Sequence, residues 1–289
     1  FIFFFHSDFK AMPRLSFFDD ISKGAKDVLN DGYFVGNKAT MKIKHIDGVN
    51  ITAEAKATSG KPVLTKISGD FAPCNYCNVK KLSVDTTGAL VADVDFTRLV
   101  KYTTFTLRTL KNYNEFGMKK VAVGTKVMTG NVAFDASFDC MGNKYNSGLV
   151  YAYKNLLMGV KVSGAGCEFA GADLAASYRC NNLLVSCTGY NLFKKADIAM
   201  FYEMNGKTKL SAVCKMASLH EMPKVEVGLV SKLSKDTELR AKVNSVGEVS
   251  GFYKATVDNR LTYSGSLTVD AAHLNGGNHK VGFGIEFIF

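Results

Sequence analysis

The sequence predicts an all-β protein, a transmembrane β-barrel of about 19 strands with an N-terminal amphipathic helix inside its lumen. Apolar and polar residues alternate with a period of two from Asn37 to Phe287, as they do along β-strands. No window approaches the roughly 18 to 20 consecutive apolar residues that a transmembrane helix requires. The 26 glycines and only 4 prolines fit short strands joined by turns. A membrane role must therefore come through strands.

The single predicted helix comes first in the chain. Ser16 is the expected N-cap, because Asp19 follows three residues later, and Gly32 is the expected stop. The apolar residues at helical spacing are Phe17, Phe18, Ile21, Ala25, Val28 and Leu29, and charged residues occupy the other face. We expect residues 17–30 to lie inside the barrel, with Lys23 and Lys26 toward the lumen. The alternative is an interfacial helix lying on the membrane.

The strands are predicted from the alternation itself. In the segment 237–243, Leu239, Ala241 and Val243 alternate with charged residues. Near the front of the chain, Asp47 and Gly48 form a hairpin turn signal between two such segments. Counting segments to the end gives about nineteen strands, each near the length that crosses a bilayer at a tilt. The connections are short, so consecutive strands should pair antiparallel.

The number of strands indicates which face of the sheet is exposed to water. A closed sheet of about 16 or more strands encloses a space too wide for side chains to fill, so the polar set must face water and the apolar set lipid. Acidic residues such as Glu54, Asp93, Asp95 and Glu238 share this lumen, but cations exceed them. Positive walls raise the local anion concentration, which predicts anion preference. The expected pore-lining cations are Lys23, Lys26, Lys38, Lys42, Lys44, Lys56, Lys66, Lys120, Lys126, Arg240, Lys242, Lys254 and Lys280.

Charge and motif content exclude several other classes. A net charge of +10 implies anionic partners. A nucleic-acid binder should cluster basic residues with exposed aromatics, whereas here they alternate with aliphatics. The strand count disfavours a soluble ligand carrier, and scattered histidines without a phosphate-binding loop argue against an enzyme. Cys74 and Cys77 have C-x-x-C spacing but no second pair, so they are expected in a turn, and we expect no metal or cofactor.

Both ends of the chain resemble a known family. The run of residues 20–29, followed by Gly32 and Tyr33, is similar to the N-terminal helix and linker of the voltage-dependent anion channel (mitochondrial porin) family. Residues 276–287 resemble the last strand of that family. The layout matches from Met12 onward, most sharply at the two ends and from about Lys224. The family has nineteen strands. This odd number implies that the first strand, near residues 37–45, pairs in parallel with the last, residues 280–287.

The chain can also be divided into segments. The opening run Phe1–Phe5 is too short for a secretory signal and Met12 is the expected start, so residues 1–11 are expected to be leader or upstream sequence. Residues 12–36 are then the helix and linker, and 37–289 the barrel. Gly32 and Gly36 match linker glycines that act as a hinge, although Phe34 stands in place of a third glycine between them, and Asp31 replaces a basic residue. The sorting signal of mitochondrial barrel proteins is matched by Lys280, Gly282, Ile285 and Phe287.

The function implied by the resemblance is a voltage-gated, weakly anion-selective channel of the mitochondrial outer membrane. Its expected cargo is ATP, ADP, phosphate and chloride, and its expected partners are membrane lipids, further copies of the chain and cytosolic kinases. A protein-import pore of the same mitochondrial barrel superfamily is the alternative. The lumen of an import pore should be more acidic because it handles basic presequences, so the basic balance favours the channel.

Overall fold

The computed structural model describes residues 15–46, 48–112, 117–218, 221–276 and 278–289, so the expected leader lies outside the described residues. A short 3-10 helix η1 (Phe18–Asp20) and helix α1 (Lys23–Asn30) precede one sheet of nineteen strands. The strands are β1 (Gly36–Ile46), β2 (Val49–Ala57), β3 (Leu64–Cys74), β4 (Cys77–Asp85), β5 (Ala89–Val100), β6 (Thr103–Asn112), β7 (Met118–Thr129), β8 (Val132–Asp139), β9 (Lys144–Tyr153), β10 (Leu156–Ala165), β11 (Glu168–Cys180), β12 (Leu183–Tyr190), β13 (Lys195–Asn205), β14 (Thr208–Met216), β15 (Lys224–Lys232), β16 (Thr237–Asn244), β17 (Glu248–Val257), β18 (Leu261–Asp270) and β19 (Lys280–Ile288).

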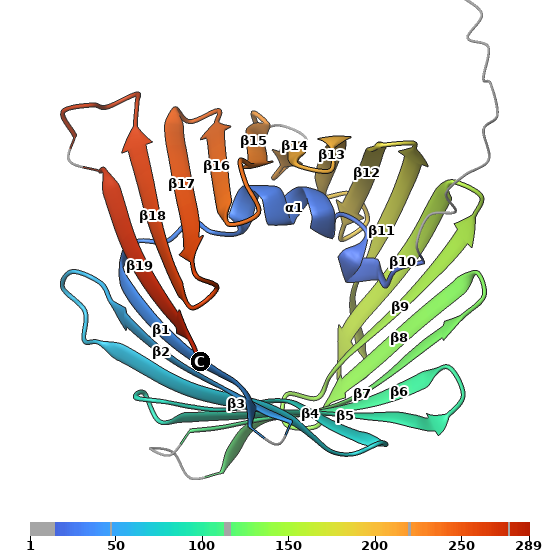
Figure 1. The fold of residues 1–289 in the computed structure, drawn as a ribbon. Helices are drawn as coiled ribbons and strands as arrows, with labels where there is room; N and C mark the ends of the chain where they lie inside the picture. Colours follow the sequence, from blue (N-terminus) through green and yellow to red (C-terminus); the bar gives the residue numbers. More distant parts are fainter. Residues whose placement is uncertain (1–14, 47, 113–116, 219–220, 277) are drawn as a thin grey trace, which may run out of the picture.

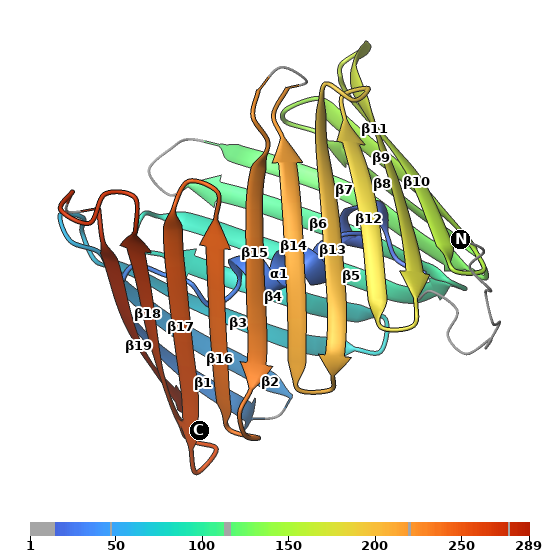
Figure 2. The same ribbon diagram turned by 90° about the horizontal axis from the view of Figure 1, so that it is seen from above.

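The sheet closes on itself. Each strand pairs antiparallel with the next in sequence, and β1 pairs in parallel with β19, with Gly36 opposite Gly282 and Lys42 opposite Ile288. The predicted strand number and the parallel seam are therefore confirmed. Figure 1 shows the strands as a ring, and Figure 2 shows them inclined across the wall of the barrel. Closure leaves no edge strand with unpaired backbone N–H and C=O groups, which the interior of a membrane would not tolerate.

The helix lies on the inner side of the ring (Figure 1), where α1 contacts β13, β14 and β15 while η1 contacts β9 and β10. The interfacial alternative is therefore wrong. Buried apolar residues gather in two clusters, both where the helical segment meets the wall. Because the lumenal face elsewhere is polar, this contact is the main apolar core of the described residues. No helix in the described ranges is long and apolar enough to cross a membrane.

The helical segment differs from the prediction in one respect. Instead of one helix from Phe17 to Asn30, a 3-10 turn ends at Asp20 and α1 starts at Lys23. Ser16 is not a cap: Phe17 precedes η1, Ser22 precedes α1, and neither makes a side-chain capping bond. Apolar side chains of both pieces pack against the wall, Phe18 in η1 and Ala25 and Leu29 in α1.

Candidate functional site

The register of the strands defines two faces of the wall. Where β15 pairs with β16, Gly228 faces Lys242 and Val230 faces Arg240 on the side that carries the helix. On the opposite side Val227 pairs with Val243, and each is 45% exposed. Exposed apolar side chains of this kind recur on the outer face of nearly every strand. A continuous apolar outside around a polar inside is the arrangement of a membrane barrel with a wet lumen.

The N-terminal part of the helical segment is seated on β8 to β11. Phe18 and Ile21 are 5% and 3% exposed and pack against Val150, Leu157 and neighbouring alanines of the wall. The lumenal residue between them on β10 is Gly159, where an added Cβ would lie 2.9 Å from Phe18. This glycine therefore provides the space that Phe18 and Ile21 occupy.

A second contact seats the helix on β13 to β15. Ala25 and Leu29, each 1% exposed, pack against Ala199 and Val213. Ser211 donates a hydrogen bond of 2.9 Å from its Oγ to the carbonyl of Ala25. Side-chain truncation of a buried leucine costs about 2 to 5 kcal/mol in typical cores, so this contact alone can hold a short helix in place.

Polar contacts at Asp19 and Lys26 also tie the segment to the wall. Lys161 Nζ lies 2.7 Å from Asp19 Oδ1. Lys26 Nζ donates to the hydroxyl of Tyr190 at 3.1 Å, and this hydroxyl donates to Asp197 Oδ2, also at 3.1 Å. Lys26 is therefore directed at polar side chains on the lumenal face of the wall, and its role in anion selectivity stays a prediction.

Arg240 closes the C-terminal end of the helix. Its Nη1 donates to the carbonyl oxygens of Asp27 at 3.3 Å and Asp31 at 3.2 Å, while its Nε donates to Glu238 Oε1 at 2.6 Å. The last carbonyls of a helix carry partial negative charge, so a guanidinium here stabilises the docked helix. The sequence indicated a lumenal cation at this position but gave no sign of its capping role.

The linker is fitted closely to the wall. Gly32 and Gly36 have φ of +90° and +84°, a conformation that favours glycine. Between them Phe34 packs edge-on against Phe252, with ring centroids 6.4 Å apart, and its amide donates to Ser266 Oγ at 3.3 Å. On β19, a side chain at Gly282 would collide with the backbone of Phe34. The glycines predicted as a hinge therefore do allow a bend, but Phe34 fixes that bend against β17 to β19.

Tyr33 of the linker has a different environment. Burial raises the pKa of Tyr33 to about 12, so its phenol is neutral at physiological pH. The ammonium of Lys242 lies 4.6 Å from the centre of this ring, a cation–π geometry. Lys126 lies over the ring of Phe17 in the same way, at 5.1 Å. Two predicted pore-lining cations thus contact the helical segment and its linker.

Several other predicted cations are paired with carboxylates. Lys38 and Lys56 both lie 3.0 Å from Glu54, and Lys42 lies 2.8 Å from Glu286. Lys23 is exposed and lies 3.3 Å from Asp20. Pairing weakens the field that each cation projects into the lumen. The predicted cations with no ion pair among the described residues are Lys44, Lys66, Lys120, Lys126, Lys242, Lys254 and Lys280.

The wall opposite the helix also carries acidic residues. Asp95, 5% exposed, pairs with Lys80, and Asp93 lies 3.9 Å from Arg108. Many of the remaining cations lie outside the lumen, in turns at the two ends of the barrel. They are Lys61, Lys101, Lys154, Lys194, Lys207, Lys235 and Arg260, a larger set than the carboxylates Glu221, Asp236 and Asp258 in the turns that the structure describes. Among these described residues, the positive balance is therefore moderate in the lumen and marked in the turns.

These features define a class of protein, a pore-forming outer-membrane β-barrel with a helix seated in its lumen. A sequence model of the eukaryotic porin family matches residues 15–282, and the chain belongs to this family. The family is a class of channel and not of enzyme, and no group of residues suited to metal binding is found in the described ranges.

Individual relatives of the chain support the same family assignment. The "Voltage-dependent anion-selective channel" of Drosophila melanogaster is 24% identical over 93% of this chain and 97% of its own length. The human "Non-selective voltage-gated ion channel VDAC1" is 22% identical over 93% of this chain and 96% of its own. A porin from Rhodopseudomonas blastica shares the fold, with a TM-score of 0.50 at 11% identity, over 76% of this chain and 88% of its own. The family and these names give no support to the import-pore alternative.

Proposed function

We propose that the protein is a voltage-gated, weakly anion-selective channel of the mitochondrial outer membrane that passes small anionic metabolites. The observation that carries this proposal is the closed nineteen-strand wall whose inner face is polar and holds cations beside a seated helix. A barrel of this strand number leaves an aqueous channel. Chloride, phosphate, ADP and ATP are the proposed cargo. Self-association and binding of a cytosolic kinase stay predictions.

The electrostatics support a weak preference and not a tight site. Most lumenal cations near the helix contact carboxylates, carbonyls or aromatic rings, so their fields are partly cancelled. Cations without such contacts, together with the turn cations at the two mouths, raise the local anion concentration by steering. The names of the two relatives above, one anion-selective and one non-selective, fit a preference of small size.

Voltage dependence is proposed to act through the seated helical segment. It carries Asp19, Asp20, Lys23, Lys26 and Asp27 inside the barrel, where movement relative to the membrane would move charge through the field. Each elementary charge moved through the full field contributes about 2.3 kcal/mol per 100 mV. Since Lys161 and Arg240 hold opposite ends of the segment, release of these contacts is the step on which voltage should act.

Release of trapped solutes from vesicles tests the proposed cargo. Purified protein is inserted into vesicles loaded with labelled ATP, with a size-matched cationic dye and with a dextran too large for a barrel of this strand number. The proposal predicts release of ATP, slower release of the cation and retention of dextran. Equal retention of ATP and dextran would rule out a metabolite channel, and faster release of the cation would contradict the anion preference.

A further inference from the structure

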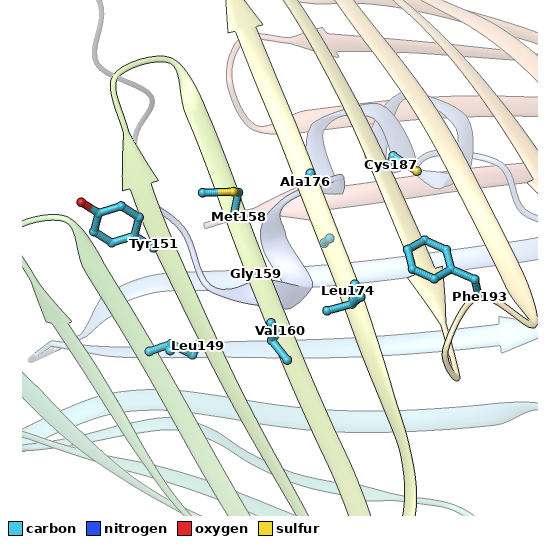
Figure 3. A pocket seen from close by; sticks show the side chains of 10 residues that line it. Leu149, Tyr151, Met158, Gly159, Val160, Leu174, Ala176, Cys187 and Phe193 are labelled. Carbon is cyan, nitrogen blue, oxygen red and sulfur yellow. The ribbon is translucent and has the colours of Figure 1, made fainter.

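An apolar groove of about 450 Å³ runs along the outer face of β9 to β12. Figure 3 shows its lining side chains, which come from four neighbouring strands and the turn after β12. They include Met158, Val160, Leu174, Ala176, Cys187 and Phe193. The volume falls within the roughly 300 to 1,000 Å³ of typical small-molecule sites.

The shape of the groove follows from small residues and a fixed turn. The small side chain of Ala176 on β11 leaves space between the larger side chains of β10 and Phe193, and this space forms the bottom of the groove. In the turn after β12, Asn191, Leu192 and Phe193 all have positive φ, a conformation that non-glycine residues rarely adopt. The turn is held there because the amide of Leu192 donates to the carbonyl of Ala172 at 2.8 Å. Phe193 therefore forms a defined end wall of the groove.

The groove lies back to back with the seat of the helical segment. Gly159 and Ala175 line the groove, and both also belong to the inner contact. A Cβ added at Gly159 would lie 2.9 Å from Phe18 and 3.1 Å from Ile21. Figure 3 shows the helical segment behind these strands. Only the thickness of the wall separates a molecule in the groove from the residues that hold Phe18 and Ile21.

The chemistry next to the groove indicates what occupies it. The groove opens on the lipid-facing side, and its lining is almost entirely apolar, which suits an acyl chain. Lys194 follows Phe193 in the turn at the end of the strands, is exposed, and has no ion pair among the described residues. Cations at this level attract anionic lipid headgroups.

We propose that the groove binds one acyl chain of an anionic phospholipid, with the phosphate at Lys194, and that the bound chain stabilises the wall beneath Phe18 and Ile21. A phospholipid with an acidic headgroup suits both features, the apolar groove and the exposed cation that follows Phe193 in the turn. The competing occupant is a second copy of the protein, which would need an apolar ridge to fill the groove.

Photolabelling of the full chain in vesicles tests the proposal. The vesicles contain neutral phospholipid and a trace of phosphatidic acid with a photoreactive acyl chain, and labelled peptides are mapped. Ala176→Phe fills the groove from its outer face, and Ala241→Phe, at an outward position on β16, is the matched control. Lys194→Gln removes the cation, with Lys61→Gln in another turn at the same end as its control.

The expected result is labelling concentrated on residues 149–193, lost in Ala176→Phe and retained in Ala241→Phe. Lys194→Gln should abolish the advantage of the phosphatidic acid probe over a phosphatidylcholine probe, and Lys61→Gln should not. Labelling spread evenly around the barrel, or unchanged by Ala176→Phe, would overturn the proposal. Oxidative cross-linking of Cys187 between two copies in the same vesicles would instead assign the face to self-association. These readouts do not require conduction, so they stand apart from the channel function.

Discussion

Replacement of Gly228 by alanine is the sharpest perturbation of the seated helix. Gly228 lies on the lumenal face of β15, and an added Cβ would lie 2.6 Å from Cδ2 of Leu29 and 3.3 Å from the carbonyl of Ala241. Leu29 is 1% exposed and the backbone of β16 cannot give way, so either the Leu29 side chain must move within a packed contact or the helix must shift. Gly228→Ala should therefore weaken docking without removing any polar contact.

The size of the effect follows from packing costs. Overpacking of a close contact costs about 1 to 3 kcal/mol. If the docked helix is the open state, this cost favours closure, and at about 2.3 kcal/mol per charge per 100 mV it corresponds to roughly 40 to 130 mV for one gating charge. The midpoint voltage for closure should move toward zero by this amount, divided by the number of charges that move.

The assay is the voltage dependence of conductance in planar bilayers. Gly251→Ala is the matched control, because a Cβ at this glycine of β17 meets nothing within 4 Å. Leu29→Ala alone should also weaken docking, because it removes a buried side chain, and adding Gly228→Ala to it should cause little further shift because the colliding group is gone. The reasoning fails if Gly228→Ala behaves like Gly251→Ala, or if Gly228→Ala shifts the closing voltage as much in the Leu29→Ala background as in the original chain.

Three further predictions concern charge and the linker. Arg240→Gln should shift the closing voltage and lower the anion preference, because it removes both the helix cap and a lumenal cation. Lys280→Gln should lower only the anion preference. Identical voltage curves for the two variants would contradict the capping role of Arg240. Phe34→Gly should speed amide hydrogen exchange across residues 31–36, and unchanged exchange would show that Phe34 does not fix the linker. Asp95→Asn removes the carboxylate partner of Lys80 on the wall opposite the helix, so the reversal potential should indicate a stronger preference for anions while the voltage dependence stays constant. A change in voltage dependence would show that the two walls are coupled.

The barrel was predictable because its information is local and repeated. Alternation places Leu239, Ala241 and Val243 on one face whatever the distant strands do, and the pairing of β16 confirms it. The parallel seam followed from an odd strand number, which came from the family resemblance as well as from the count. The paired lumenal lysines, such as Lys38 beside Glu54, also lie on the face that alternation assigned to them.

The seat of the helix was not predictable because its contacts are remote in sequence. Arg240 is 213 residues from the carbonyl of Asp27, and Lys26 is 164 residues from Tyr190. One signal was present: Gly159 and Gly228 interrupt lumenal positions within otherwise regular strands, which indicates a close approach by another segment.

Single-channel recording of the purified protein in a planar bilayer under a KCl gradient tests the central claim most directly. The account predicts a large open conductance, a reversal potential that modestly favours chloride, and closure as voltage of either sign rises. A reversal potential favouring potassium, or a conductance that does not change with voltage, would contradict it, and the absence of any conductance from correctly folded protein would show that the barrel is not an open pore.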